Sequence, residues 1–269
     1  MYKVTVVLFA LLLAAPLAGA QQFTTSPCQD GNGSSSWLFG HQERVCEVRK
    51  YTLPLESGQV RVQAENGGLE VYGEDRHDVY LEARVTAQGS SAEEAQKLLH
   101  QVQIQTHGTI EAKGPDSSGW HGGGWSVSFA LRVPHQLTAG NFETSNGAVA
   151  VTDVEGRIEI GSTNGALNLR FVAGDVRAHT TNGGISIGLS GNRLRGQGLD
   201  ARTTNGGISV KASPNLSAHL VAETTNGGIH VGYPNVQVSE HNSVDANIGG
   251  GGGTLRLETT NGGISVNPN

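Results

Sequence analysis

Apolar and polar residues alternate along most of the chain after about residue 51, and the alternation is centred on a recurring Asn-Gly pair. Around Asn205, for example, apolar side chains stand at Leu199, Ala201, Ile208 and Val210. A period of two residues is typical of β-strands with one buried face. Each Asn-Gly pair is therefore predicted to join two strands that bury their apolar sides in a common core.

The sequence Thr-Thr-Asn-Gly-Gly-Ile-Ser-Val, clearest at 203–210 and 259–266, recurs along the chain with variations. Seven copies are anchored on Asn66, Asn146, Asn164, Asn182, Asn205, Asn226 and Asn261. The second to seventh copies follow one another at intervals of 18, 18, 23, 21 and 35 residues. A repeat near twenty residues is the signature of a solenoid, in which each repeat packs only against its neighbours.

Two arrangements of these strands are open. Asn-Gly tolerates positive φ and favours tight turns, so each copy would form a β-hairpin. Alternatively the chain coils, and each strand pairs in parallel with the same strand of the next rung. The coil is preferred because like residues would then stack about 4.8 Å apart in ladders. The prediction is an all-β, single-domain β-solenoid, similar to a parallel β-helix, with one short helix in its N-terminal half. Its turn ladder consists of Asn146, Asn164, Asn182, Asn205, Asn226 and Asn261.

Charges at outward positions are evidence for the register between one rung and the next. Five positions before the asparagine, Arg177 is followed one copy later by Asp200. Three positions before it, Arg202 is followed by Glu223. Opposite charges on adjacent strands fit cross-strand pairing, so both pairs are predicted to be neighbours.

The chain divides into a lead-in, residues 21–50, and a solenoid domain, residues 51–269. The less regular part, 51–140, contains the predicted helix Ser91–His100, which begins with a serine cap and acidic residues. Regular rungs occupy 141–231, and a long loop, 232–253, precedes the last rung, 254–266. This rung is expected at the open end of the stack, where exposed strand edges favour self-association unless the long loop covers them.

Residues 1–20 have the pattern of a secretory signal peptide. Lys3 is followed by the apolar run 4–13 and by the small-residue cleavage site 18–20. The alternative is a membrane anchor, for which the apolar run is short. A lipoprotein signal would need cysteine where Ala20 stands. We therefore expect an exported protein, periplasmic or at the cell surface, without a transmembrane segment after signal cleavage.

Charge and cysteine content narrow the function further. The whole chain has 18 Lys and Arg and 24 Asp and Glu, so loss of Lys3 leaves 17 minus 24, a net charge of −7. Such a charge argues against nucleic acid as a partner. Cys28 and Cys46 are the only cysteines, and in an exported chain they predict a disulfide. The alternative is two free or metal-binding thiols.

The chain resembles the DUF4097 family, whose members are often labelled "putative adhesins". The resemblance rests on the Thr-Thr-Asn-Gly-Gly-Ile rungs, on the segment Leu69-Glu-Val-Tyr-Gly-Glu-Asp-Arg76, and on Leu131-Arg-Val-Pro134 before the regular repeats. It covers most of the chain from about Tyr51. It implies an exported β-solenoid at the envelope or surface, and it supplies no catalytic residues.

The tentative binding residues are Trp120, His121 and Trp125, in the glycine-rich stretch 117–125. Tryptophans in a loop stack on sugars or anchor a partner. The alternative is that they cap the apolar end of the solenoid. The histidines lack metal-ligand spacing, so no metal and no cofactor is predicted.

Two enzyme patterns are also present. The segment Gly184-Ile-Ser186-Ile-Gly188 matches a nucleophile elbow, but Ser186 falls inside a predicted strand rather than between strand and helix. A polysaccharide-active enzyme would need clustered carboxylates, and of Glu143, Glu223 and Glu258 only the last two could adjoin. Both patterns are interpreted as structural.

The sequence thus favours a non-enzymatic, adhesin-like interaction scaffold of the cell envelope, which binds an unknown envelope protein or glycan. The alternative is a carbohydrate-binding module that uses the Trp120 and Trp125 loop. A polysaccharide-active β-helix enzyme is the third hypothesis.

Overall fold

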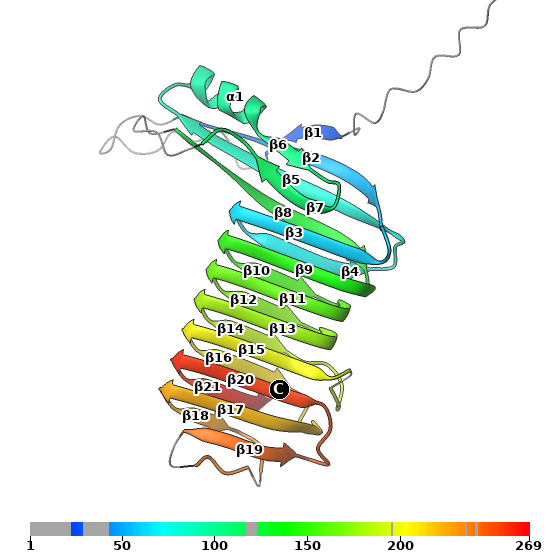
Figure 1. Cartoon of the computed structure of the whole chain (residues 1–269), viewed down its shortest axis with the longest axis vertical. Coiled ribbons are helices and arrows are strands. Elements are labelled where there is room, and N and C mark those ends of the chain that lie inside the picture. Colours follow the sequence, from blue (N-terminus) through cyan, green and yellow to red (C-terminus); the bar gives the residue numbers. More distant parts are fainter. Residues whose placement is uncertain (1–22, 29–42, 117–122, 195, 235, 240–241) are drawn as a thin grey trace, which may run out of the picture.

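The computed structural model describes residues 23–28, 43–116, 123–194, 196–234, 236–239 and 242–269. In this part of the chain, two large β-sheets form an elongated stack with one helix at its N-terminal end (Figure 1). Each regular rung contributes one strand to each sheet, and the Asn-Gly pair forms the corner between them. The predicted β-solenoid is therefore confirmed.

The eleven-stranded sheet begins with antiparallel strands and continues with the shorter strand of each rung. In spatial order its strands are β1 (Thr24–Pro27), β2 (Glu43–Pro54), β5 (Asp78–Gly89), β8 (Gly124–Pro134), β4 (Leu69–Glu74), β10 (Val149–Thr152), β12 (Leu167–Arg170), β14 (Ile185–Gly188), β16 (Ile208–Ala212), β21 (Ile264–Pro268) and β18 (Ile229–Val231).

The ten-stranded sheet contains the longer strand of each rung. In spatial order its strands are β6 (Gln103–Gln105), β7 (Thr109–Lys113), β3 (Gln59–Asn66), β9 (Gln136–Asn146), β11 (Glu155–Asn164), β13 (Ala173–Asn182), β15 (Gly198–Asn205), β20 (Thr254–Asn261), β17 (Ala218–Asn226) and β19 (Ser243–Ile248).

The N-terminal end of the stack is built differently from the rungs. Strands β1, β2, β5 and β8 pair antiparallel, and β8 then pairs in parallel with β4 of the first rung. Helix α1 (Ala92–Gln101) starts at Ser91, whose hydroxyl accepts a hydrogen bond from the Glu94 amide. The helix buries Ala95 and Leu99. The buried Arg49 of β2 donates to the Leu99 carbonyl at 2.9 Å and so connects β2 to the C-terminal end of α1.

The lead-in predicted at residues 21–50 contributes two strands where it is described. Strand β2 begins at Glu43, within the lead-in, and pairs with β5 along its whole length. Cys28 and Cys46 form the predicted disulfide, with their Cα atoms 5.7 Å apart. The bond ties the end of β1 to its partner β2.

The spatial order of the rungs differs from the order in the sequence. Strands β20 and β21, the last in the chain, lie between the rung of Asn205 and the rung of Asn226. The prediction that this rung lies at the open end is therefore wrong. Strands β17 and β18 occupy that position, and β19, from the predicted long loop, pairs antiparallel with β17.

The changed order also corrects one predicted charge pair. Arg177 and Asp200 are register partners, as expected. Arg202 is not beside Glu223, because the inserted strand β20 places Glu258 there. At this position an acidic residue follows Arg202 in either order, so the pair did not distinguish them.

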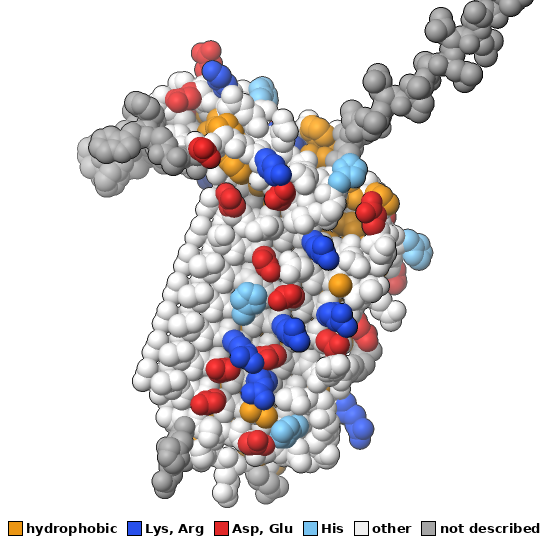
Figure 2. Space-filling view, in the orientation of Figure 1, with side chains coloured by type: hydrophobic (Ala, Val, Ile, Leu, Met, Phe, Trp, Pro, Cys, Tyr) orange, Lys and Arg blue, Asp and Glu red, His pale blue; other side chains and the backbone are white. Residues whose placement is uncertain are grey.

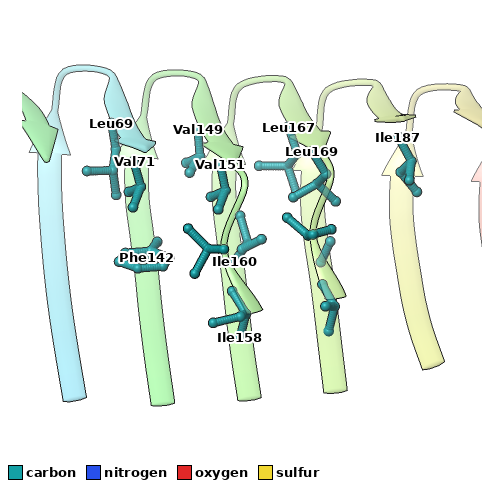
Figure 3. Packing of buried hydrophobic residues seen from close by; sticks show 14 of the residues in the cluster. Leu69, Val71, Phe142, Val149, Val151, Ile158, Ile160, Leu167, Leu169 and Ile187 are labelled. Carbon is teal, nitrogen blue, oxygen red and sulfur yellow. The ribbon is translucent and has the colours of Figure 1, made fainter. Parts of the chain in front are cut away.

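The core is a narrow apolar layer between the two sheets. The apolar columns predicted from the repeat point inward and stack from rung to rung (Figure 3). Phe142, Ile160, Val151 and Leu169 are fully buried. A side chain at Gly140 would lie 2.8 Å from the Phe142 ring, so the absence of a Cβ makes room for one of the two largest fully buried side chains.

The corner glycines are needed for a different reason from the one expected. Of the seven glycines that directly follow the ladder asparagines, only Gly67 has a positive φ. A Cβ on Gly183 would instead lie 2.1 Å from the carbonyl oxygen of Gly165 on the neighbouring rung. The next position is more open, and alanine occupies it at Ala148 and Ala166. Close stacking of the backbone, not turn conformation, therefore requires the first glycine.

Candidate interaction surface

The outward face of the ten-stranded sheet carries three parallel columns of side chains, at one, three and five residues before each ladder asparagine. The column nearest the corner holds Glu65 in the first rung and Ser or Thr in the others, and the other two columns hold most of the charges. Figure 2 shows basic and acidic side chains interleaved across this face, and an uncharged margin at the left where the corners lie. Neighbouring strands in a sheet lie about 4.8 Å apart, so each column repeats at that spacing.

The uncharged margin is a ridge built on a continuous asparagine ladder. From Asn146 onward, each asparagine amide donates to the side-chain oxygen of the asparagine before it in the stack, at 2.8–2.9 Å. In spatial order the ladder is Asn66, Asn146, Asn164, Asn182, Asn205, Asn261 and Asn226. Beside it lie the exposed hydroxyls of Ser145, Thr163, Thr181, Thr204, Thr260 and Thr225. We call these two columns the Thr–Asn ridge.

The ridge is held in place by a second, buried column of hydroxyls. Thr180, two residues before its asparagine, donates to the carbonyl of Gly165 on the neighbouring rung at 2.9 Å. Thr203 makes the same bond to Gly183 at 2.8 Å. The hydroxyls in this column are satisfied although they are buried, which fixes the corner of each rung relative to the next.

The charged columns form ion pairs both along and between strands. Arg202 donates to Asp200 on its own strand at 2.8 and 2.9 Å, and its guanidinium lies 3.3 Å from Glu258 on β20. The hydrogen bond to Asp200 raises the pKa of Arg202. Like charges meet one step further, because Glu258 and Glu223 are register partners. The surface is therefore a mosaic of both signs with local excesses of negative charge.

Two histidines, His179 and His219, also lie on the outward face of the ten-stranded sheet. The ring of His179 lies over Gly161, where a Cβ would come within 2.8 Å of it. His219 on β17 lies 2.8 Å from Asp245 on β19. The second contact joins the last regular rung to the strand that covers it.

The outward face of the eleven-stranded sheet is chemically different. Along the rungs it presents small uncharged residues, and its charged side chains on β10 to β18 are Arg170 and Lys211. Ser265 donates to Ser209 at 3.3 Å across this face. A partner would therefore meet many charges of both signs on the face of the ten-stranded sheet and few charges on the face of the eleven-stranded sheet.

The predicted tryptophan loop is described only in part. Trp120 and His121 lie outside the described residues. Trp125 lies at the start of β8, packs against the apolar core, and donates to the Pro115 carbonyl at 2.8 Å. These contacts hold Trp125 against the core, and both the capping role and sugar binding by the loop stay predictions.

The residues that imitate enzyme motifs lie in regular strands. Ser186 is exposed on β14, between Asn168 and Ser209, and the next described element is strand β15. Glu223 and Glu258 adjoin, whereas Glu143 lies on β9, several rungs away. Within the described residues, no group of three or more His, Cys, Asp or Glu side chains is placed to hold a metal ion. No helix of the described chain is long and apolar enough to cross a membrane.

The sequence profile of the family described as Toastrack DUF4097 matches residues 52–267, which include all seven ladder asparagines. The chain belongs to the Toastrack DUF4097 family. Cys28 and Cys46 precede the matched Toastrack region, so the disulfide is an addition to it. Among curated proteins, none matches the sequence.

Two solved structures align with most of this Toastrack chain. One is described as a "putative cell adhesion protein" from Clostridium sporogenes, with 10% identity and a TM-score of 0.46, covering 82% of this chain and 100% of that one. Another is described as a "putative adhesin" from Bacteroides fragilis, with 12% identity and a TM-score of 0.43, covering 82% of this chain and 96% of that one.

Proposed function

We propose that this Toastrack protein is a non-enzymatic, adhesin-like scaffold that binds a protein or glycan of the cell envelope. The proposed contact surface is the outward face of the ten-stranded sheet, formed by the charged columns and the Thr–Asn ridge. The observation that carries the proposal is that the outward side chains of this face stand in columns that repeat from rung to rung, with charges of both signs interleaved (Figure 2). A repeated surface makes many weak contacts at once, and their combined strength exceeds that of each contact alone.

The charge pattern suits recognition rather than catalysis. Arg177, Asp200 and Arg256 alternate in sign on three adjacent strands. Exposed ion pairs contribute only about 0–1 kcal/mol to stability, so these charges are available to a partner at little cost to the fold. Complementary charges on a partner would speed association and select against unsuitable surfaces.

Export is part of the same proposal. The pattern of residues 1–20 supports secretion, and the Cys28–Cys46 disulfide supports passage into an oxidising compartment. Both features agree with a final location in the periplasm or at the cell surface.

The test compares two double variants with equal loss of charge. The mature protein, residues 21–269, is immobilised and exposed to purified envelope proteins and envelope glycans. Arg177→Gln with Arg256→Gln removes two exposed positive charges from the proposed surface. Arg170→Gln with Lys211→Gln removes two from the opposite sheet face and serves as the control. We expect the first variant to weaken binding at least tenfold and the control to bind within about twofold of the parent.

Three outcomes would contradict the proposal. Equal losses in both variants would mean that net charge alone matters. Glycan binding that survives loss of both arginines but is lost on Trp125→Ala would favour the carbohydrate-binding alternative. Release of new sugar ends, abolished by Glu223→Gln, would show an enzyme.

A further inference from the structure

One end of the stack leaves a strand edge with a defined pattern of hydrogen-bonding groups. Strand β18 pairs with β21 on one side and with no described strand on the other. The β17 half of the same rung is covered by β19 up to Thr224, whose amide donates to the Asn242 carbonyl. The free edge therefore runs from Asn226 through the corner to Val231.

The hydrogen bonds between neighbouring rungs show which groups pair with such an edge. The corner glycine amide donates to the asparagine carbonyl of the next rung, as Gly262 does to Asn226. The amide three residues after the asparagine donates to a carbonyl of that rung, as Ile264 does to Gly228. The next asparagine also donates its side-chain amide to the ladder, as Asn226 does to Asn261.

At the free edge each of these groups is present but has no partner in the described part of the chain. Among the described residues, no acceptor is found for the amides of Gly227 and Ile229, and no donor for the side-chain oxygen of Asn226. Ile229 and Val231 are half-buried, whereas their equivalents inside the stack are almost fully buried. Gly227 is exposed, whereas the other corner glycines are half-buried.

Within this protein, a rung edge of the same kind already pairs with a strand from a distant part of the sequence. The rung of Asn261 is added to the rung of Asn205, although 56 residues separate the two asparagines. The addition uses the same amide ladder and the same hydroxyl contact, from Thr259 to the Gly206 carbonyl at 2.8 Å. Recognition at a junction thus depends on the local pattern of residues and not on their order in the chain.

We propose that the edge Asn226–Val231 binds an extended segment of another protein, which adds one further parallel strand. The segment carries Asn-Gly, any small residue, and apolar residues three and five positions after the asparagine. The asparagine donates to Asn226, and the carbonyls of the segment accept from Gly227 and Ile229. The glycine is required because a Cβ at the matching internal position, Gly262, would lie 2.1 Å from a neighbouring carbonyl oxygen. Strand addition of this type takes affinity from main-chain bonds and specificity from alternate side chains.

This edge shares only Asn226 with the Thr–Asn ridge and none of the charged side chains varied above, so the two proposals stand or fall independently. The probe is the labelled octapeptide Thr-Thr-Asn-Gly-Gly-Ile-Ser-Val, added to the mature protein at concentrations where the peptide alone is monomeric. We expect saturable binding by fluorescence anisotropy. Replacing the asparagine or the first glycine of the peptide with alanine is expected to weaken binding at least tenfold. Alanine at the second glycine is the matched control and should change binding less than threefold, since Ala148 and Ala166 occupy that position.

The location is tested by amide hydrogen exchange and by one protein variant. Bound peptide should protect the amides of Ile229 and Val231. Ile229→Pro removes an edge donor and should abolish binding, whereas His230→Ala changes a side chain on the same strand and should not. Because the peptide series needs no altered protein, it remains decisive if the proline variant fails to fold.

Several results would overturn the proposal. These are the absence of saturable binding up to about 1 mM, equal binding of the asparagine and alanine peptides, and protection confined to strands other than β18. Self-association of the protein through β18, with no peptide binding, would identify a second copy as the occupant and would also overturn it.

Discussion

Asn261 donates its side-chain amide to Asn205 at 2.9 Å, although Asn226 lies between them in the sequence. Asn226 in turn donates to Asn261. The last rung of the chain is therefore enclosed between two earlier ones. In this order both edges of the C-terminal rung are paired with neighbouring rungs. The rung of Asn226 is left at the end of the stack, and its longer strand, β17, is covered by β19. Because the rungs are nearly identical, any two of them present compatible contacts.

The inserted position of the last rung is tested by engineered cysteines. Ser209 and Ser265 are register partners with their hydroxyl oxygens 3.3 Å apart. Ser209→Cys with Ser265→Cys should form a disulfide on mild oxidation, because neighbouring strands meet the distance requirement. Ser209→Cys with His230→Cys should not, since β21 separates those strands. Peptide mapping by mass spectrometry distinguishes the two, and a disulfide in the second variant would indicate rungs stacked in sequence order.

Adjacent corner glycines should respond very differently to the same substitution. In Gly183→Ala, the new Cβ would lie 2.1 Å from the Gly165 carbonyl oxygen, so the rungs must separate. We expect a loss of about 3 kcal/mol or more in the free energy of unfolding, or failure to fold. In Gly184→Ala, the nearest atom is 3.4 Å away, and we expect a change below about 1 kcal/mol. Urea denaturation measures both, and equal effects would contradict the steric account.

Loss of one ladder asparagine should destabilise the stack modestly. Asn182→Ala removes the bond donated to Asn164 at 2.9 Å and the bond accepted from Asn205 at 2.8 Å. Since the amides are exposed and water replaces part of each bond, we expect a loss of about 1–2 kcal/mol in unfolding free energy. Ser186→Ala, at an exposed position on the next strand, is the control and should change it by less than about 0.5 kcal/mol. Matching values for the two variants would mean that the ladder does not stabilise the fold.

Alkaline pH should loosen the segment that directly follows β18. Tyr233 is buried and donates to the Ser213 carbonyl at 2.8 Å, and burial raises its pKa above the ordinary value of 10.0. The folded state therefore keeps this proton to higher pH than the unfolded chain does. The resulting stability is complete below about pH 10 and is lost as pH rises through the folded pKa.

The comparison with Tyr233→Phe isolates this group from other tyrosines whose pKa is also raised, such as Tyr51 and Tyr80. We expect the difference in unfolding free energy between the two proteins to shrink as the pH rises from about 8 to about 11. A difference that stays constant over this range would show that Tyr233 does not ionise on unfolding.

The repeat made the local structure predictable to an unusual extent. The alternation around each asparagine predicted the inward columns, and the stacking of like residues predicted parallel pairing, because both depend on contacts that every rung repeats. The helix at Ser91 was predictable from its cap and its acidic first turn. The Thr–Asn ridge could have been identified from the same columns, since its residues are nearly constant one position before the asparagine.

The sequence by itself determined that the chain forms rungs, which side chains each rung buries, and where it turns. Only the tertiary structure decided the order of the rungs, the pairing of Arg202 with Glu258, and the free edge at β18. The physical reason is that nearly identical rungs make nearly identical contacts, so the local pattern is the same whichever neighbour a rung has. The covering of β17 by β19 and the insertion of β20 and β21 involve long-range packing of the whole chain, which no short segment specifies.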